Sequence, residues 1–170
     1  SRLTMQAATQ VMPPKVVHTI PATINLQEEV KNAHKQLRVA AYCRVSTKQE
    51  DQLNSYDVQR RAYTDKINGE SGWTMVGIYA DKGITGTSVK KRDDFNRLMR
   101  HCKQGKVDMI ITKSVARFAR NTLDCLKHTR MLKEHNVDVY FEEQGIHSIQ
   151  PGAEFYITIY GSIAQSESEN

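Results

Sequence analysis

The chain carries four short apolar runs, and each is followed by a segment in which apolar residues recur at helical spacing. The runs cover residues 37–45, 73–80, 107–112 and 137–141. Short uninterrupted runs of this kind are typical of strands that a parallel sheet buries on both faces. Because strands and helices alternate, we expect an α/β fold with right-handed crossovers, a mostly parallel sheet and helices on both of its faces.

The helical segments carry apolar stripes, which predict the side of each helix that packs on the sheet. Asp93 or Asp94 is expected to cap the second of these helices, and Asn121 is expected to begin the third. The three stripes are Leu53, Tyr56, Tyr63 and Ile67; Phe95, Leu98, Met99 and Cys102; and Leu123, Cys125, Leu126, Thr129 and Leu132.

The C-terminal segment supports two interpretations. By propensity, Tyr156–Tyr160 favours a strand. The apolar spacing instead favours a helix, and we predict a helix here. This helix would carry a stripe that either packs on its own sheet or forms an association surface, and the sequence leaves both open. The residues that repeat at helical spacing and form this stripe are Phe155, Ile159, Ile163 and Glu167.

Residues 1–36 differ from the rest of the chain. Met12-Pro13-Pro14 and Ile20-Pro21 favour extended backbone, and no strand–helix alternation is visible there. We therefore expect residues 1–36 to be a partly ordered N-terminal leader and residues 37–170 to be the folded domain.

Composition narrows the class of protein only modestly. A chain of 170 residues suits one domain with a sizeable core, and its net charge of +5 suits an anionic partner without establishing nucleic acid. Cys43, Cys102 and Cys125 lack metal-ligand spacing and lie within apolar patterns, so we expect reduced core thiols in a cytosolic protein. No apolar run approaches the ~20 residues of a membrane span.

Polar residues stand where each predicted strand ends, namely Ser46, Asp81, Lys113 and Glu142. In open α/β sheets this edge binds ligands. Arg44 shares a strand face with Ser46, and a guanidinium holds an anion well beside a nucleophile but accepts no proton readily. The alternative is that Ser46 only caps the following helix and Arg44 is a solvated strand end.

A second basic cluster follows the third strand. Arg117 and Arg120 would share a face if this turn were helical, and both lie near a helix start, where backbone amides favour anions. Together with Arg44 and Arg92, they would place several guanidiniums beside one hydroxyl. An ordinary solvated basic turn is the alternative.

Several motifs resemble those of the serine recombinases, the resolvase and invertase family. Tyr42–Thr47 resembles the family's active-site strand, and Asp81–Gly86 is similar to its Asp-Lys-x-x-(Ser/Thr)-Gly loop. Arg92–Phe95 resembles its arginine before the next helix. Ser114–Thr122 is similar to the form found in large serine recombinases of mobile elements, and Ile163–Glu167 resembles the long final helix.

The resemblance implies a fold and an activity. The fold would be a resolvase-like three-layer domain with four to five strands and a long C-terminal helix, truncated here, as in an isolated catalytic domain. The activity would be that of a site-specific DNA recombinase, a transposase or integrase of a mobile element. Its serine would cleave DNA through a 5′-phosphoserine intermediate and religate after strand exchange, without metal, ATP or another cofactor.

The resemblance also assigns roles to residues. Ser46 matches the nucleophile, and four arginines match those around the scissile phosphate. Lys113 is a further supporting candidate, because it ends the third strand. Ala116 departs from the aspartate of small resolvases, so an ion pair that would orient Arg117 is absent or is replaced by one with Asp81. The full candidate set is Ser46, Arg44, Arg92, Arg117, Arg120, Asp81 and Gln59, supported by Tyr42, Lys113 and Glu167.

The partners implied are DNA, a homodimer on each DNA site and a homotetramer at synapsis, in the bacterial cytoplasm, with no membrane and no small-molecule substrate. An arginine, the phosphate or a water would accept the Ser46 proton.

Two other functions stay open: a noncatalytic nucleotide- or DNA-binding regulatory α/β domain, and a phosphatase with a serine nucleophile. Against a nucleotide-binding regulator, the loop after the first strand lacks Gly-x-Gly-x-x-Gly and Walker patterns.

Overall fold

The first predicted strand forms the middle of the sheet as β1, Leu37–Ser46. This computed structural model describes residues 35–46, 51–83 and 91–169. The predicted leader up to residue 34, and residues 84–86 of the Asp81–Gly86 segment, lie outside the described residues.

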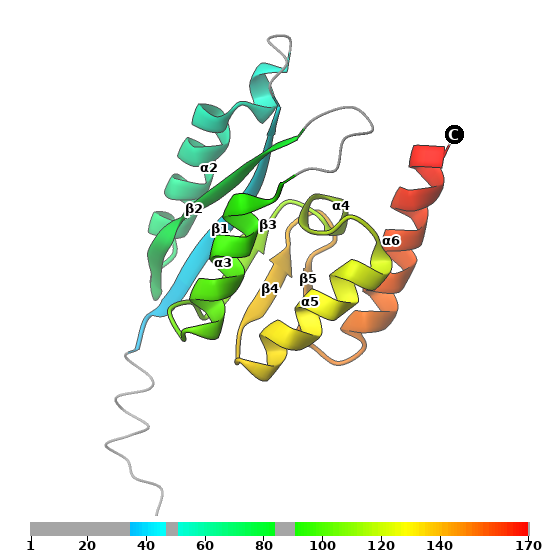
Figure 1. Cartoon of the computed structure of the whole chain (residues 1–170). Helices are drawn as coiled ribbons and strands as arrows, with labels where there is room; N and C mark the ends of the chain where they lie inside the picture. Colours follow the sequence, from blue (N-terminus) through cyan, green and yellow to red (C-terminus); the bar gives the residue numbers. More distant parts are fainter. Residues whose placement is uncertain (1–34, 47–50, 84–90, 170) are drawn as a thin grey trace, which may run out of the picture. The chain divides into compact units, whose positions relative to one another are not determined.

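Five strands form one sheet in the order β2-β1-β3-β4-β5 (Figure 1). The first four are parallel, as predicted, and β5 pairs with β4 in the antiparallel sense. A β-bulge interrupts the β1–β2 register beside Val39. The remaining strands are β2, Trp73–Gly83; β3, Met109–Thr112; β4, Asp138–Phe141; and β5, Ile146–His147.

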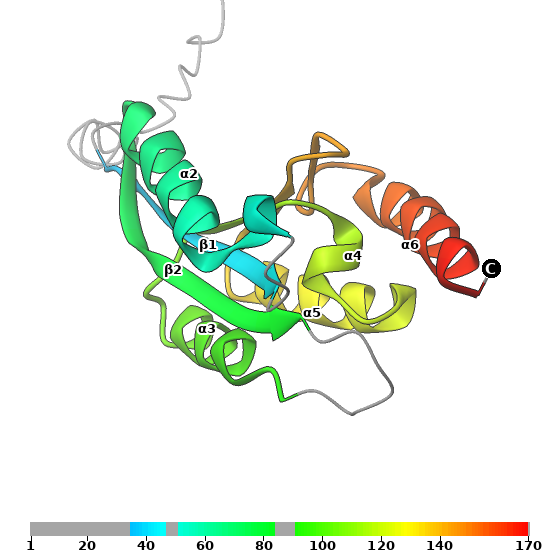
Figure 2. The same ribbon diagram turned by 90° about the horizontal axis from the view of Figure 1, so that it is seen from above.

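Helices cover both faces of the sheet, with α2 on one face and α3 and α5 on the other (Figures 1 and 2). This arrangement confirms the predicted three layers. The helices are α2, Tyr56–Gly69; α3, Asp93–Lys103; α4, Val115–Phe118; α5, Thr122–Glu134; and α6, Ala153–Glu169; a 3₁₀ turn, η1, covers Gln52–Asn54.

Alternate residues of β1 enter two separate cores. Val39, Ala41, Cys43 and Val45 pack with Tyr63 and Ile67 of α2 and with Met109 and Ile111 of β3. The even positions, Ala40 and Tyr42, pack instead among α3, α4 and α5. Since strand side chains alternate, Arg44 and Ser46 continue the even face at the carboxyl end of β1.

The carboxyl end of β1 is also where the order of the sheet changes direction. The chain goes from β1 to its neighbour β2 on one side, and then returns to β3 on the other side. In open α/β sheets such a switch point leaves a crevice outside the carboxyl ends of the strands. Ser46 is therefore the last strand residue at the point where this architecture binds ligands.

Two stripe positions of α2 and one of α5 were predicted wrongly. Leu53 is 81% exposed and Tyr56 is 46% exposed. Leu53 lies in η1, before the helical phase of α2 begins, so only Tyr63 and Ile67 are buried. Leu123 is 77% exposed, because it lies two residues before Cys125 and six before Thr129, which places it on the opposite side of the helix from these buried positions.

The predicted cap of α3 was also wrong, whereas the predicted start of α5 is confirmed. Arg92 occupies the N-cap of α3 without a side-chain bond. Asp81 of β2 instead accepts hydrogen bonds from the amides of Asp94 and Phe95, at 2.9 and 3.0 Å. The helix α5 begins at Asn121-Thr122 as predicted, and the Asn121 side chain caps it by accepting from the amide of Asp124 at 2.8 Å. A strand residue thus supplies the cap for α3 and fixes that helix to the sheet.

The C-terminal segment is helical, as predicted, and its stripe faces outward. Phe155, Ile159 and Ile163 are 66%, 40% and 51% exposed, whereas Ile157 is fully buried. Burial of the stripe on the sheet of the same chain is therefore excluded. All three cysteines are buried free thiols, as expected. Within the described ranges, no helix is long and apolar enough to cross a membrane.

Candidate active site at the carboxyl end of β1

Ser46 ends β1 in a half-buried position opposite Gly83 of β2. Arg44 lies two residues earlier on the same strand face and opposite Asp81. The Ser46 hydroxyl is thus carried by a rigid central strand rather than by a loop. A rigid support of this kind suits a group that must meet a reacting atom in one geometry.

Two side chains from other elements meet at the backbone carbonyl of Arg44. Gln59 of α2 donates from Nε2 to this oxygen at 3.1 Å and also to the carbonyl of Asn54 at 2.9 Å. Arg117 of α4 donates from Nη1 to the same Arg44 oxygen at 3.4 Å. Gln59 therefore joins the end of β1 to η1, and Arg117 is brought beside the strand that carries Ser46.

The guanidinium of Arg44 lies in a confined and electropositive place. Burial lowers the pKa of Arg44, and the nearby charges of Arg92 and Arg117 lower it further, partly offset by Tyr42 and Asp81. A Cβ on Gly83 would lie 3.1 and 3.2 Å from Cγ and Cδ of Arg44. Glycine at position 83 thus leaves room for the Arg44 stem, and the electrostatics group three of the four predicted arginines.

Arg92 is held within an aromatic cage. Its Cζ lies 3.5 Å from the Phe95 ring centroid and 5.5 Å from that of Tyr42. Its Nη2 donates to the carbonyl of Phe118 and, at 3.4 Å, to the hydroxyl of Tyr42. Only 8% of the residue is exposed, so this cation is largely desolvated. Cation–π contacts of desolvated cations are worth about 2 kcal/mol.

Tyr42 and Asp81 form a buried pair next to this cage. The Tyr42 hydroxyl donates to Asp81 Oδ2 at 2.9 Å. Burial raises the pKa of Tyr42 to about 12, so the phenol stays protonated at neutral pH. The Asp81 oxygens also accept the two α3 amides, while Arg117 bonds the Arg44 carbonyl. The expectation that Asp81 pairs with Arg117 is therefore wrong in this structure.

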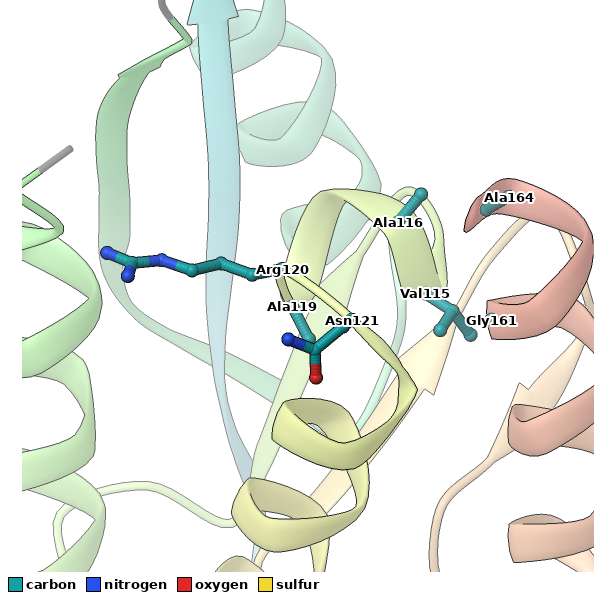
Figure 3. Close-up of a pocket in the computed structure, with 7 residues that line it drawn as sticks. All are labelled: Val115, Ala116, Ala119, Arg120, Asn121, Gly161 and Ala164. Carbon is teal, nitrogen blue, oxygen red and sulfur yellow. The ribbon is translucent and has the colours of Figure 1, made fainter. Parts of the chain in front are cut away.

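Arg117 and Arg120 do not share a helical face, because α4 ends at Phe118 and Ala119 is extended. Figure 3 shows the Arg120 side chain leaving the 119–121 link on the side away from α6. It lines a cavity of about 270 Å³ together with Lys91, Arg92, Asp93, Phe95, Asn96, Asp124 and His128. Arg120 thus lines the same cavity as Arg92, whereas Arg117 contacts the backbone of Arg44.

The opposite side of the 119–121 link faces α6. A cavity of about 190 Å³ lies there between α4 and α6 (Figure 3). Beside it, Gly161 of α6 lies so close to Thr122 that a Cβ at position 161 would overlap the Thr122 hydroxyl. The glycine allows α6 to contact the start of α5 directly, next to the link that carries Arg120.

Two supporting candidates remain, Lys113 and Glu167. Lys113 is exposed after β3 and forms a 3.9 Å ion pair with Glu143. Glu167 lies within α6, and its side chain is outside the described part of the structure.

Two residues of the site escaped sequence reasoning. Gly83 was assigned only to a loop, although its lack of a Cβ accommodates Arg44. Asp124 was not singled out from the sequence, yet its carboxylate contacts Arg92 Nη1 at 3.5 Å. An acidic residue three positions after an Asn cap was the available signal, since it resembles a capping box. Across the described ranges, no group of three or more His, Cys, Asp or Glu could hold a metal ion.

The chain is similar to known proteins in both sequence and fold. A family model described as the resolvase N-terminal domain matches residues 39–170. The Tn3 transposon resolvase of Escherichia coli is 30% identical over 131 residues, which cover 77% of this chain and 64% of that protein. A resolvase/recombinase of Pseudomonas putida is 28% identical over 131 residues, covering 77% and 65%. The chain thus spans slightly less than two thirds of these relatives.

Solved structures agree with the fold. A resolvase family site-specific recombinase from Streptococcus pneumoniae is 30% identical, has a TM-score of 0.56, and is matched over 79% of this chain and 90% of that chain. The N-terminal catalytic domain of TP901-1 integrase has a TM-score of 0.57 at 23% identity, over 78% and 97% of the two chains.

Proposed function

Since this chain belongs to the resolvase family, whose N-terminal domain it matches over residues 39–170, we propose that residues 37–170 are the catalytic domain of a site-specific DNA recombinase of a mobile element, with Ser46 as its nucleophile. One observation carries the proposal beyond family membership. The strand that ends in Ser46 carries the Arg44 guanidinium, and two further guanidiniums reach this strand, from Arg117 of α4 and from Arg92 at the N-cap of α3.

The proposed reaction conserves the phosphodiester. Ser46 Oγ attacks the phosphorus, the bond from phosphorus to the 3′ oxygen breaks, and the 3′ oxygen leaves as a hydroxyl after taking a proton. The 5′ end stays linked to Ser46 as a phosphoserine ester. After strand exchange, a 3′-hydroxyl attacks that ester, Ser46 is released, and no ATP is consumed.

Arginines supply the charge that this chemistry needs. Phosphoryl transfer depends on positioning and on neutralising the oxygens of the phosphate. Arg44 and Arg117 are the candidates beside Ser46, and Arg92 with Arg120 extend the positive field on the α3 side. Fixed guanidiniums in a partly desolvated site can do this without a metal ion.

The contacts of the neighbouring groups narrow the choice of proton acceptor for Ser46. Asp81 already accepts three hydrogen bonds, and Tyr42 is a protonated phenol with a raised pKa. Neither is suited to act as a base. A phosphate oxygen or a water is therefore the acceptor that we favour.

We further propose DNA as the substrate, a homodimer on each DNA site, a homotetramer at synapsis, and action in the bacterial cytoplasm. The exposed α6 stripe, defined as Phe155, Tyr156, Ile159, Tyr160 and Ile163, is the association surface. At about 100° per residue this stripe is centred well away from Ile157 and Gly161, which pack on the same chain. Exposed apolar patches of this kind mark interaction sites.

The α6 stripe gives a prediction about assembly. Ile159→Asp places a charge in the middle of the stripe and should convert a dimer of this chain into a monomer in sedimentation equilibrium. Thr158→Asp adds the same charge on a different side of α6 and should leave the dimer intact. A wild-type chain that is monomeric at every concentration up to about millimolar would reject this stripe as the surface of a stable dimer. Such a dimer typically buries ~800 Å² per partner.

Covalent trapping tests the proposed reaction. We suggest a pool of duplexes with randomised sequence and 3′-bridging phosphorothiolate linkages, because a 3′-thiol leaves readily and attacks phosphorus poorly. The wild-type chain should accumulate a 5′-linked protein–DNA adduct at the same rate with and without EDTA. Release of a free 5′-phosphate without an adduct would indicate hydrolysis by water and would contradict the proposal.

A further inference from the structure

The structure assigns a role to a residue outside the candidate set. We propose that Asp124 is a positioning residue for phosphoryl transfer, which holds the Arg92 guanidinium and the Arg120 backbone in place from the first turn of α5. This inference rests on the proposed function, because it acts through two arginines of the proposed site.

One carboxylate makes all of these contacts. Asp124 Oδ2 lies 3.5 Å from Arg92 Nη1 and accepts from the backbone amide of Arg120 at 3.3 Å. Asp124 Oδ1 lies 3.1 Å from Nε2 of His128, one helical turn further along α5. Asp124 therefore joins the residue before α3, the link before α5 and α5 itself.

Arg92 depends on this contact for its charge balance. Asp124 is the one carboxylate that contacts Arg92 within the described ranges. The other partners of the guanidinium are neutral, namely two aromatic rings, a carbonyl and a phenol. Its Nε is buried and has no hydrogen-bond partner in the described part of the chain. Removal of one partner from a buried ion pair is strongly destabilising, because it leaves the other charge uncompensated.

The contacts of His128 fix the carboxylate in turn. The imidazole lies against the Phe95 ring, with centroids 4.8 Å apart and planes at 79°. Phe95 is the ring on which Arg92 stacks, so the two aromatic contacts and the carboxylate enclose the same guanidinium. Burial lowers the pKa of His128, as does the charge of Arg92, while Asp124 raises it. This histidine is therefore mostly neutral at pH 7 and serves as a hydrogen-bond partner rather than a competing cation.

The same cavity provides a matched control. Asp93 also lines it, but Asp93 is exposed in the first turn of α3 and is not the carboxylate that Arg92 contacts. Replacement of Asp93 by Asn changes the net charge and the cavity lining as Asp124→Asn does, and it leaves the Arg92 contact in place. A general electrostatic effect would therefore appear in both variants, and a positioning effect only at Asp124.

The first test compares adduct formation at saturating phosphorothiolate DNA. Asp124→Asn should slow the chemical step by about tenfold to a hundredfold, as expected for a misplaced catalytic group, with the half-saturating DNA concentration unchanged. Asp124→Glu should recover part of the rate, because it retains the charge. Asp93→Asn should match the wild-type rate. Equal rates for the two Asn variants would overturn the inference.

The second test needs no activity. In ¹⁵N NMR spectra of arginine side chains, the Nε–H of Arg92 should exchange slowly with water in the wild-type chain and in Asp93→Asn, and faster in Asp124→Asn. Unchanged exchange in Asp124→Asn would overturn the inference whether or not the chain cleaves DNA. Absence of any wild-type adduct would count against the proposed function, whereas this spectrum would still decide whether Asp124 holds Arg92.

Discussion

Ser46→Ala is expected to abolish the covalent protein–DNA adduct. The hydroxyl is the group that we assign as nucleophile. Removal of the nucleophile from a covalent mechanism lowers the rate by at least ~10⁴-fold. DNA retention in a filter-binding assay should change little, because phosphate contacts from arginines provide most non-specific affinity. The variant should also keep its fold, since Ser46 is half-buried at a strand end and is outside both cores.

Ser71→Ala is the matched control for this result. Ser71 is exposed in the turn before β2, so its removal tests the loss of a serine hydroxyl away from the sheet edge. It should form the adduct at the wild-type rate. If Ser46→Ala still forms an adduct at a comparable rate, another residue is the nucleophile and the site has been assigned wrongly.

Arg44→Ala is expected to slow adduct formation by about 10²–10³-fold, the usual loss when one donor to developing negative charge is removed. The effect should appear at saturating DNA, because the guanidinium acts on the reacting phosphate beside Ser46. Arg44→Lys should recover little of the rate, since an ammonium cannot contact two phosphate oxygens as a planar guanidinium does.

The control for the arginine is Arg61→Ala. Arg61 is exposed on α2 and is outside the candidate set, so this change removes the same charge from the chain and leaves the candidate residues in place. It should lower non-specific DNA affinity slightly and leave the saturated rate unchanged. Unfolding followed by circular dichroism should be the same for Arg44→Ala as for the wild-type chain, because Arg44 belongs to neither core. Equal saturated rates for the two variants would contradict a catalytic role for Arg44.

The sequence predicted best the features that depend on local pattern. The apolar run from Leu37 to Val45 predicted a central strand, and its alternation predicted that Arg44 and Ser46 share a face. Periodicity also predicted the buried face of α3 and the helical state of α6. These features follow from side-chain direction in strands and helices, which is set by the backbone alone.

The remaining features depend on distances between elements, which local pattern does not contain. Asp81 caps α3 only because β2 ends beside the start of that helix. Arg120 leaves in a different direction from Arg117 because Ala119 is extended, and a three-residue spacing cannot reveal such a break. Similarly, the role of Gly83 depends on the Arg44 side chain of β1, and the role of Asp124 depends on Arg92, which is 32 residues earlier in the chain.

The most direct test of the central claim is to identify the residue that carries the DNA. The trapped adduct is digested with nuclease and protease, and the modified peptide is sequenced by mass spectrometry. We predict a nucleotide joined through its 5′-phosphate to Ser46. A nucleotide on any other residue, or cleaved DNA with no modified peptide at all, would contradict the assignment of Ser46 as the nucleophile.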